Sequence, residues 1–109
     1  MAYDHDLAAR VRQALPVGPE LTELKMFGGV CYCLNGNMAC GVHGSRLIVR
    51  LGKERQPAAL TLPHTRPFDL TGRAMAGWIM VEEPGCANEE DLADWVQQGL
   101  EFARALPPK

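Results

Sequence analysis

The stretch VCYCLNGNMAC, residues 30–40, decides the fold of this chain. A run rich in strand-forming residues leads into Asn35-Gly36, and a second short apolar run follows. Asn-Gly favours a two-residue type I′ turn, because both central positions of that turn need positive φ. The predicted hairpin pairs Leu34 with Asn37, Cys33 with Met38, Tyr32 with Ala39 and Cys31 with Cys40. One face of that hairpin then carries Cys31, Cys33, Met38 and Cys40.

Segments on both sides extend the hairpin into a larger sheet. Residues 21–26 lead into Phe27-Gly28-Gly29, where the glycines favour a bulge or a sharp bend before the next strand. Residues 46–51 follow another tight turn and alternate in the way of a strand. These segments predict a four-stranded antiparallel meander. One or two more strands are expected, at residues 77–82 and as a short edge segment at 68–70, with 63–67 as a connector.

Three helices are expected at the beginning, the middle and the end of the chain. The first covers about residues 4–15 and is capped by Asp4 or Asp6, and a short one starts near residue 55 with Pro57 in its first turn. Asn88 caps the longest helix, whose first turn is acidic. Its buried stripe is expected to be Leu92, Trp95, Val96, Gly99, Phe102, Ala103 and Leu106. The predicted fold class is α+β, with a mostly antiparallel sheet.

Length and composition indicate one domain over residues 1–109, with no tail or second domain. The start is acidic and polar, and no apolar stretch approaches the roughly 20 residues that cross a bilayer. We therefore expect a cytoplasmic protein without a membrane partner, whose four cysteines are thiols. The formal net charge of −2 disfavours direct binding to nucleic acid, which needs a basic surface.

Several ordered motifs resemble the N-terminal domain of the TfoX/Sxy family of competence regulators. They are the segments 25–29, 35–38, 40–42, 47–52, 66–73 with Met75 and Gly77, and 102–107. The resemblance implies an α+β fold similar to that of small bacterial secretion-chaperone-like domains, and a link to competence and transcription regulation. Regulators of this family often carry a C-terminal helical domain, so the chain is expected to be a stand-alone copy of the first domain. Cys31 and Cys33 depart from the family pattern, where plain apolar residues are usual.

The cysteines invite a zinc site, which we do not expect. Cys31, Cys33, Cys40 and His43 are residue types that bind zinc, but a strand C-x-C lacks the knuckle turn of C-x₂-C sites, and the predicted register points His43 to the face opposite the three cysteines. Buried cysteine behaves as a small hydrophobe, so core packing is the preferred interpretation. Cys86 precedes the last helix among acidic residues that raise a thiol pKa. No metal or cofactor is predicted.

Charged and aromatic residues give the candidate binding positions. One interpretation pairs Asp69 with Arg50, Arg66 or Arg73 in a structural contact. The other gathers Lys25, Arg50, Arg66 and Arg73 into a patch that binds an anion or a peptide. Phe27 and Trp78 lie beside glycines, so either one is a candidate to line a groove. The full candidate set is Lys25, Phe27, Gly28, Gly29, Arg50, Asp69, Arg73 and Trp78.

The leading functional hypothesis is a non-enzymatic protein-interaction module that affects competence or transcription through a protein partner. The alternative is a small anion- or ligand-binding domain built on the arginine and lysine patch. An enzyme is not expected, because the sequence offers no nucleophile with a base at motif spacing. An exposed sheet edge would also allow a homodimer.

Overall fold

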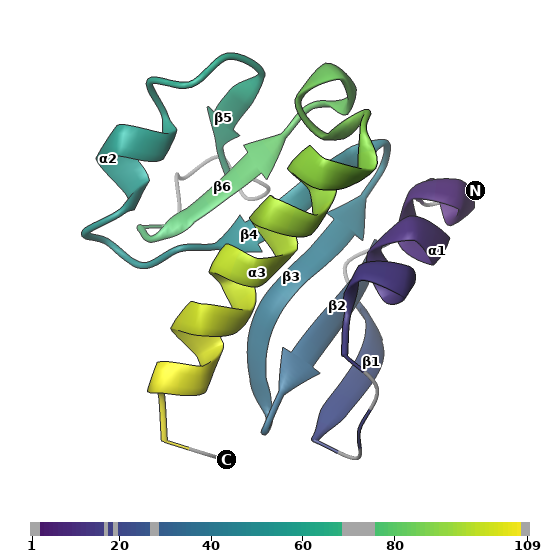
Figure 1. Cartoon of the computed structure of the whole chain (residues 1–109). Helices are drawn as coiled ribbons and strands as arrows, with labels where there is room; N and C mark the ends of the chain where they lie inside the picture. Colours follow the sequence, from purple (N-terminus) through teal and green to yellow (C-terminus); the bar gives the residue numbers. More distant parts are fainter. Residues whose placement is uncertain (1–2, 17, 19, 27–28, 69–75, 108–109) are drawn as a thin grey trace.

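The computed structural model of the chain describes residues 3–16, 18, 20–26, 29–68 and 76–107. In chain order the elements are α1 (His5–Ala14), β1 (Leu21–Met26), β2 (Gly29–Leu34), β3 (Asn37–His43), β4 (Arg46–Arg50), α2 (Gln56–Ala59), β5 (Thr65–Pro67), β6 (Trp78–Val81), the 3₁₀ helix η1 (Glu83–Cys86) and α3 (Glu89–Ala105). The strands form one sheet in the order β1-β2-β3-β4-β6-β5, and every neighbouring pair is antiparallel (Figure 1). The predicted α+β class and the four-stranded meander are confirmed.

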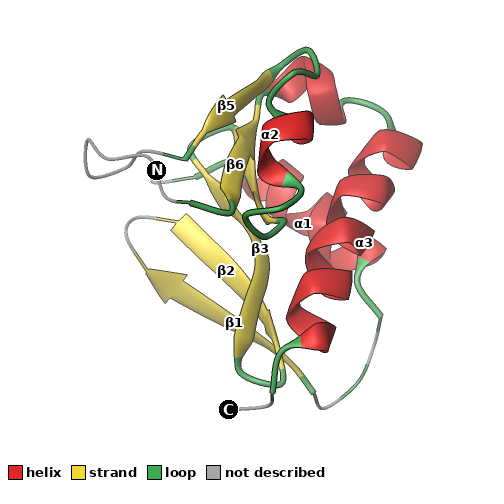
Figure 2. Cartoon of the chain, turned by 90° about the vertical axis from the view of Figure 1, so that its left-hand side faces the viewer, coloured by secondary structure: helices red, strands yellow, loops and turns green. Residues whose placement is uncertain are grey.

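Two helices cover one face of the sheet. Figure 2 shows α1 and α3 on the same side of the strands. The main core lies between them and the sheet, with Leu47, Val49, Ile79, Leu92 and Leu100 almost fully buried. Burial of each such side chain contributes roughly 1.5–3 kcal/mol. None of the helices formed by the described residues is long and apolar enough to cross a membrane.

A second, smaller cluster lies on the opposite face of the sheet. It consists of Ile48, Phe68 and Met80, with the partly buried Met38 and Trp78 packed against it. Side chains of a strand alternate between faces, so Ile48 lies opposite its neighbours Leu47 and Val49. Both faces of the central strand β4 are therefore apolar, which explains its nearly continuous apolar sequence.

The predicted hairpin forms, but its register changes after two pairs. Asn35 and Gly36 have φ of 52° and 83°, as a type I′ turn requires. The pairs Leu34–Asn37 and Cys33–Met38 are as predicted. A bulge follows, so Tyr32 pairs with Cys40 and not with Ala39, and Cys31 pairs with Gly41 and not with Cys40.

The bulge moves one cysteine to the other face. Ala39 and Cys40 both join the helix-side core, whereas Cys31 and Cys33 belong to the opposite face of β2. The predicted cysteine face is therefore wrong for Cys40. The physical reason is the packing of α3, whose Gly99 lies directly against the backbone carbonyl of Ala39.

The predicted N-caps of the first and last helices are confirmed. Asp4 Oδ1 accepts hydrogen bonds from the backbone N–H groups of Asp6 and Leu7 at 2.9 and 3.1 Å, and Asn88 Oδ1 accepts one from Asp91 at 2.7 Å. The short helix α2 carries its proline in the first turn, as expected. In α3, Leu100 is buried although the predicted stripe omits it. Phe102 and Leu106 are only partly buried.

The last edge strand lies earlier than predicted. Residues 65–67 form β5, within the segment expected to be a connector. Phe68 is buried just after that strand, and Asp69 and Leu70 lie outside the described residues. The pairing of β5 with β6 explains the difference: these three residues gain a partner strand that no local sequence pattern reveals.

Candidate functional site

A pocket of about 500 Å³ opens where β4, β6 and the C-terminal half of α3 meet. Figure 1 shows the chain leaving β4 on this side of α3 and turning toward α2. The volume falls in the usual range for small-ligand sites, about 300–1,000 Å³. The pocket is lined by Arg50, Leu51, Gly52, Lys53, Glu54, Arg55, Ala76, Gly77, Trp78, Glu101, Phe102 and Ala105.

Two glycines and one glutamine shape the backbone of the pocket. Gly52 and Gly77 both have φ of 89°, a region that L side chains rarely adopt. The Gly77 carbonyl accepts hydrogen bonds from the N–H groups of Leu51 and Gly52 at 2.8 and 3.0 Å. Gln56 donates from Nε2 to the Trp78 carbonyl at 3.0 Å and accepts at Oε1 from the Gly77 N–H at 2.9 Å. The start of β6 is thus fixed to the segment that follows β4.

Arg50 lies against two aromatic rings of the pocket. Its Cζ atom is 5.2 Å from the ring centroid of Trp78 and 5.1 Å from that of Phe102. Trp78 is also the cross-strand neighbour of Arg50 in the β4–β6 ladder. Such contacts contribute about 0.5–1 kcal/mol each at exposed sites. They restrict the guanidinium while the N–H groups at its edge stay available for an acceptor.

The described acidic residues of the pocket do not pair with Arg50. Arg55 Nη1 lies 3.3 Å from Glu101 Oε2, and both side chains are more than half exposed, so this ion pair contributes little. Lys53 and Glu54 are exposed at the rim. Among the described residues, no ion pair involves Arg50. The pocket therefore offers a restrained cation between two rings to an anionic group.

The structure brings together two of the sequence-predicted site residues, Arg50 and Trp78. Lys25 lies on β1, which is separated from β4 by two strands. Gly29 begins β2. Phe27, Gly28, Asp69 and Arg73 lie outside the described residues, so the predicted pairing of Asp69 with an arginine stays a prediction.

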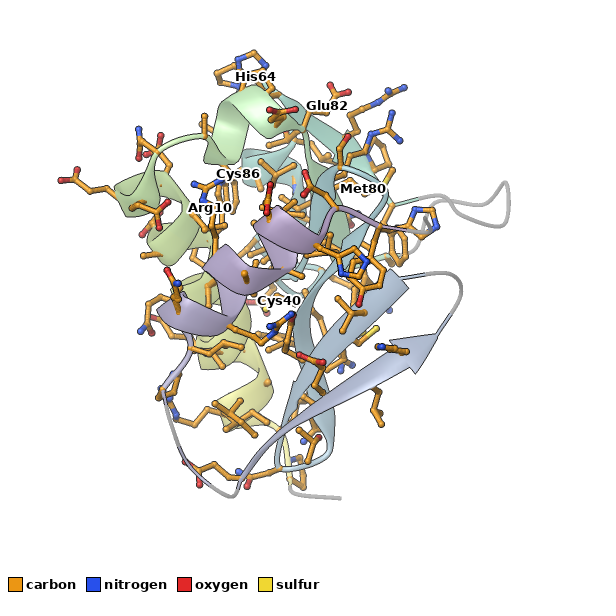
Figure 3. The ribbon with its side chains drawn as sticks, turned by 90° about the vertical axis from the view of Figure 1, so that its right-hand side faces the viewer. Arg10, Cys40, His64, Met80, Glu82 and Cys86 are labelled. Atoms are coloured by element: carbon orange, nitrogen blue, oxygen red, sulfur yellow. The ribbon has the colours of Figure 1, made fainter. Side chains whose placement is uncertain are left out.

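Arg66 takes part in a different arrangement. Its Nη1 atom is 3.7 Å from Glu82 Oε2, and Arg46 Nε is 3.8 Å from the same oxygen. Figure 3 labels Glu82. The two arginines come from β5 and β4, on either side of the strand β6 that precedes Glu82. Arg66 thus has a carboxylate partner of its own and does not line the pocket.

Burial sets the chemistry of the thiols. It raises the pKa of Cys40 from the ordinary 9.0 to about 12 and that of Cys31 to about 11, and nearby cysteines add to both shifts. The pKa of Cys86 is also raised, first by burial and then by Glu83, against the opposing effect of Arg10. Within the described part of the chain, no group of three or more histidine, cysteine or acidic residues could hold a metal ion.

His43 differs from its predicted placement. Val42 and Cys40 face the helix-side core, so alternation puts His43 on the opposite face, the one that carries Cys31 and Cys33. The bulge separates Cys40 from these residues. A zinc site was not expected in part because the predicted register pointed His43 away from all three cysteines, and that placement is wrong. The three cysteines nevertheless do not share one face.

Sequence reasoning missed several residues of the pocket. Phe102 was expected in the buried stripe of α3, because its spacing from Trp95 and Gly99 fits that stripe. Gly52, Lys53, Arg55 and Gly77 were not among the candidate binding residues, although both glycines belong to the family motifs. The available signal was the pair of glycines beside Leu51 and Trp78, since an isolated glycine next to a strand often marks a close approach of two backbones.

Comparison with known families agrees with this fold. A family model described as the TfoX N-terminal domain matches residues 13–103. The comparison with curated proteins returned no significant match, and neither did the comparison with solved structures. The matched region includes all six strands and most of α3, and it contains the three pocket side chains Arg50, Trp78 and Phe102. The chain belongs to the TfoX N-terminal domain family.

Proposed function

We propose that the domain is a non-enzymatic protein-interaction module, and that its pocket holds an acidic group of a protein partner. The observation that carries the proposal is Arg50, restrained between Trp78 and Phe102 at the pocket wall. Tryptophan and arginine are enriched among the residues that dominate binding energy at protein interfaces. A guanidinium also matches the planar geometry of a carboxylate.

The proposed biological setting follows from the family. In this proposal the domain acts in the cytoplasm and affects competence or transcription through its partner. The partner supplies a glutamate, an aspartate or a C-terminal carboxylate to Arg50, and an apolar neighbour of that group packs on the two rings. Lys53 at the rim adds positive charge on the approach to the pocket.

Two arginines of β4 provide a matched test. The full chain and its Arg50→Gln and Arg46→Gln variants are used as baits in native lysate, followed by amine crosslinking and mass spectrometry. Arg46 lies on the same strand but pairs with Glu82 outside the pocket, so its variant is the control. We expect a protein crosslinked to Lys53 with the unmodified chain and with Arg46→Gln, and its loss with Arg50→Gln.

Two outcomes would overturn the proposal. One is equal recovery of the crosslinked protein by the Arg50→Gln bait, and the other is no protein above background with any bait. Thermal melting of each variant checks folding first, because loss of the two ring contacts lowers stability by about 1–2 kcal/mol.

A small anionic ligand is the second candidate, and the pocket volume of about 500 Å³, within the usual range of small-ligand sites, favours it. Inorganic phosphate, nucleotides and dicarboxylates are added separately in thermal-shift assays. A ligand at a hundred times its dissociation constant stabilises the fold by about 2.7 kcal/mol, which raises the melting temperature of a domain of this size by about 10 °C or more. No shift with any of these ligands would remove this candidate.

A further inference from the structure

The strand β1 forms one edge of the described sheet. It pairs with β2 on one side, and no described strand pairs with its other side. The Asn35 N–H donates to the Glu20 carbonyl at 2.8 Å, which fixes the alternation of the ladder. The backbone N–H and carbonyl groups therefore point toward β2 at Thr22, Leu24 and Met26. They point outward, away from β2, at Leu21, Glu23 and Lys25.

This edge is exposed and ready to pair. The Leu21 N–H donates to the Gly18 carbonyl at 3.3 Å, but within the described chain the outward N–H and carbonyl groups of Glu23 and Lys25 form no hydrogen bond. Both side chains are exposed, and Leu24 between them is 48% exposed. An exposed apolar residue at the centre of an open edge strand is a feature that pairing with another strand would bury.

The opposite edge is different. The Glu82 N–H donates to the His64 carbonyl at 2.7 Å, so the outward positions of the three-residue strand β5 are Thr65 and Pro67. Proline has no N–H to donate. The two edges of the sheet therefore do not offer equivalent partners.

We propose that two copies of the chain pair through β1, antiparallel, about a two-fold axis at Leu24. In this register Glu23 of each copy forms a hydrogen-bonded pair with Lys25 of the other, and the two Leu24 side chains meet on the face without α1 and α3. Opposite charges directly across a ladder contribute roughly 0.2–1 kcal/mol per pair. The Glu23 carboxylate is already positioned on the helix side by Arg12, whose Nε atom lies 3.0 Å from it.

Charge selects this register over its neighbours. An axis at Glu23 places the two glutamates opposite each other, and an axis at Lys25 places the two lysines opposite each other, which is destabilising. An axis at Thr22 places Leu24 opposite Glu20 and leaves Glu23 and Lys25 without an opposite charge across the ladder. The axis at Leu24 is the one that pairs both charges and buries the exposed leucine.

The dimer is expected to be weak and concentration-dependent. A contact limited to one edge strand lies at the small end of specific interfaces, below about 1,200 Å² of total buried surface. Its detection therefore requires sedimentation velocity over a series of concentrations, from micromolar to near millimolar. The unmodified chain should show a sedimentation coefficient that rises with concentration.

Charge reversal tests the register directly. Glu23→Lys alone and Lys25→Glu alone place like charges opposite each other in a homodimer, so each should remain monomeric at all concentrations. An equimolar mixture of these two variants restores both complementary pairs and should associate. The double variant Glu23→Lys/Lys25→Glu should associate as the unmodified chain does. Glu90→Lys, a charge change at an exposed position on α3, is the control and should leave association unchanged.

Two results would overturn the proposed dimer. A monomeric unmodified chain at the highest concentration rules out the dimer. Association that persists in Glu23→Lys and Lys25→Glu places the contact elsewhere on the surface. Far-ultraviolet circular dichroism of each variant shows whether the fold is retained, and the mixture uses the same two proteins that fail to associate alone.

Discussion

Two arginines of this domain have opposite environments, although both lie close to α3. Arg10 Nε is 2.7 Å from Glu89 Oε1, and its Nη2 atom donates to the carbonyls of Cys86 and Ala87 at 2.9 Å each (Figure 3). It therefore joins α1 to the start of α3, and its role is structural. Arg50 contacts two rings and has no carboxylate partner among the described residues, which is why the candidate site is built on it.

The buried thiols predict how stability depends on pH. Unfolding exposes Cys40 and Cys31, whose pKa values then return from about 12 and about 11 toward 9.0. The unfolded chain thus binds fewer protons than the folded chain above pH 9. The free energy of unfolding should be insensitive to these thiols below that pH and should fall as the pH rises toward 11.

Urea titrations from neutral pH upward measure this effect. Tyr32, whose pKa burial also raises, contributes in the same direction. The Cys40→Ala variant removes one thiol, so its stability should fall less steeply with pH than that of the unmodified chain. A constant difference between the two proteins at every pH would indicate a packing loss alone and contradict the prediction.

Local signals at single residues were readable from the sequence. Asn88 was predicted as a helix cap, and so was Asp4 with Asp6 as the alternative, because an N-cap depends on the few residues that follow it. The contact between Arg50 and Phe102 was not predictable in this way. It needs the end of β4 and the C-terminal half of α3 to meet, and that depends on how the whole helix packs on the sheet.

Among the secondary-structure elements, the close approach of α3 to β3 determines the register of the sheet. Gly99 of α3 lies directly against the Ala39 carbonyl, and the bulge beside Ala39 puts two successive residues of β3 into the helix-side core. The turn at Asn35-Gly36 was predicted because its geometry depends on two residues. The bulge was not, because it depends on a helix far along the chain.

Gly99→Ala tests this contact with a clear sign. Alanine is favoured over glycine in a helix by about 1 kcal/mol, so an unconstrained helix would be stabilised. Here the added Cβ would collide with the backbone of β3, so we expect lower stability, by roughly 1–3 kcal/mol. Gln97→Ala, on the exposed face of the same helix, is the control and should be neutral or slightly stabilising. Chemical denaturation that showed a more stable Gly99→Ala variant would contradict the observed packing.

Acidic residues slightly outnumber basic ones, and most arginines of the described chain have a carboxylate partner. The sequence contains eleven basic and thirteen acidic residues. Five arginines of the described chain each have a carboxylate within 4 Å, at positions 10, 12, 46, 55 and 66. A phosphate backbone would have to compete with these carboxylates. We therefore predict that the domain does not bind nucleic acid through a continuous basic surface.

A gel-shift experiment with duplex DNA checks this expectation. The domain should cause no retardation at low or moderate salt, whereas a basic protein of similar size, run as the positive control, should retard the probe and release it as salt rises. Retardation by the domain that weakens with salt would show that its charge distribution does not exclude direct DNA contact.

The single proline at the end of β5 has a consequence for how this sheet behaves at high concentration. A fibril grows by edge addition only if every copy has two sheet edges, here called borders, that can each pair with a neighbouring copy. Here β1 is open while the far border is three residues long and lacks an amide hydrogen at Pro67. A copy that uses β1 in the proposed dimer has no comparable border left among the described strands, so we expect edge-to-edge association to stop at a pair.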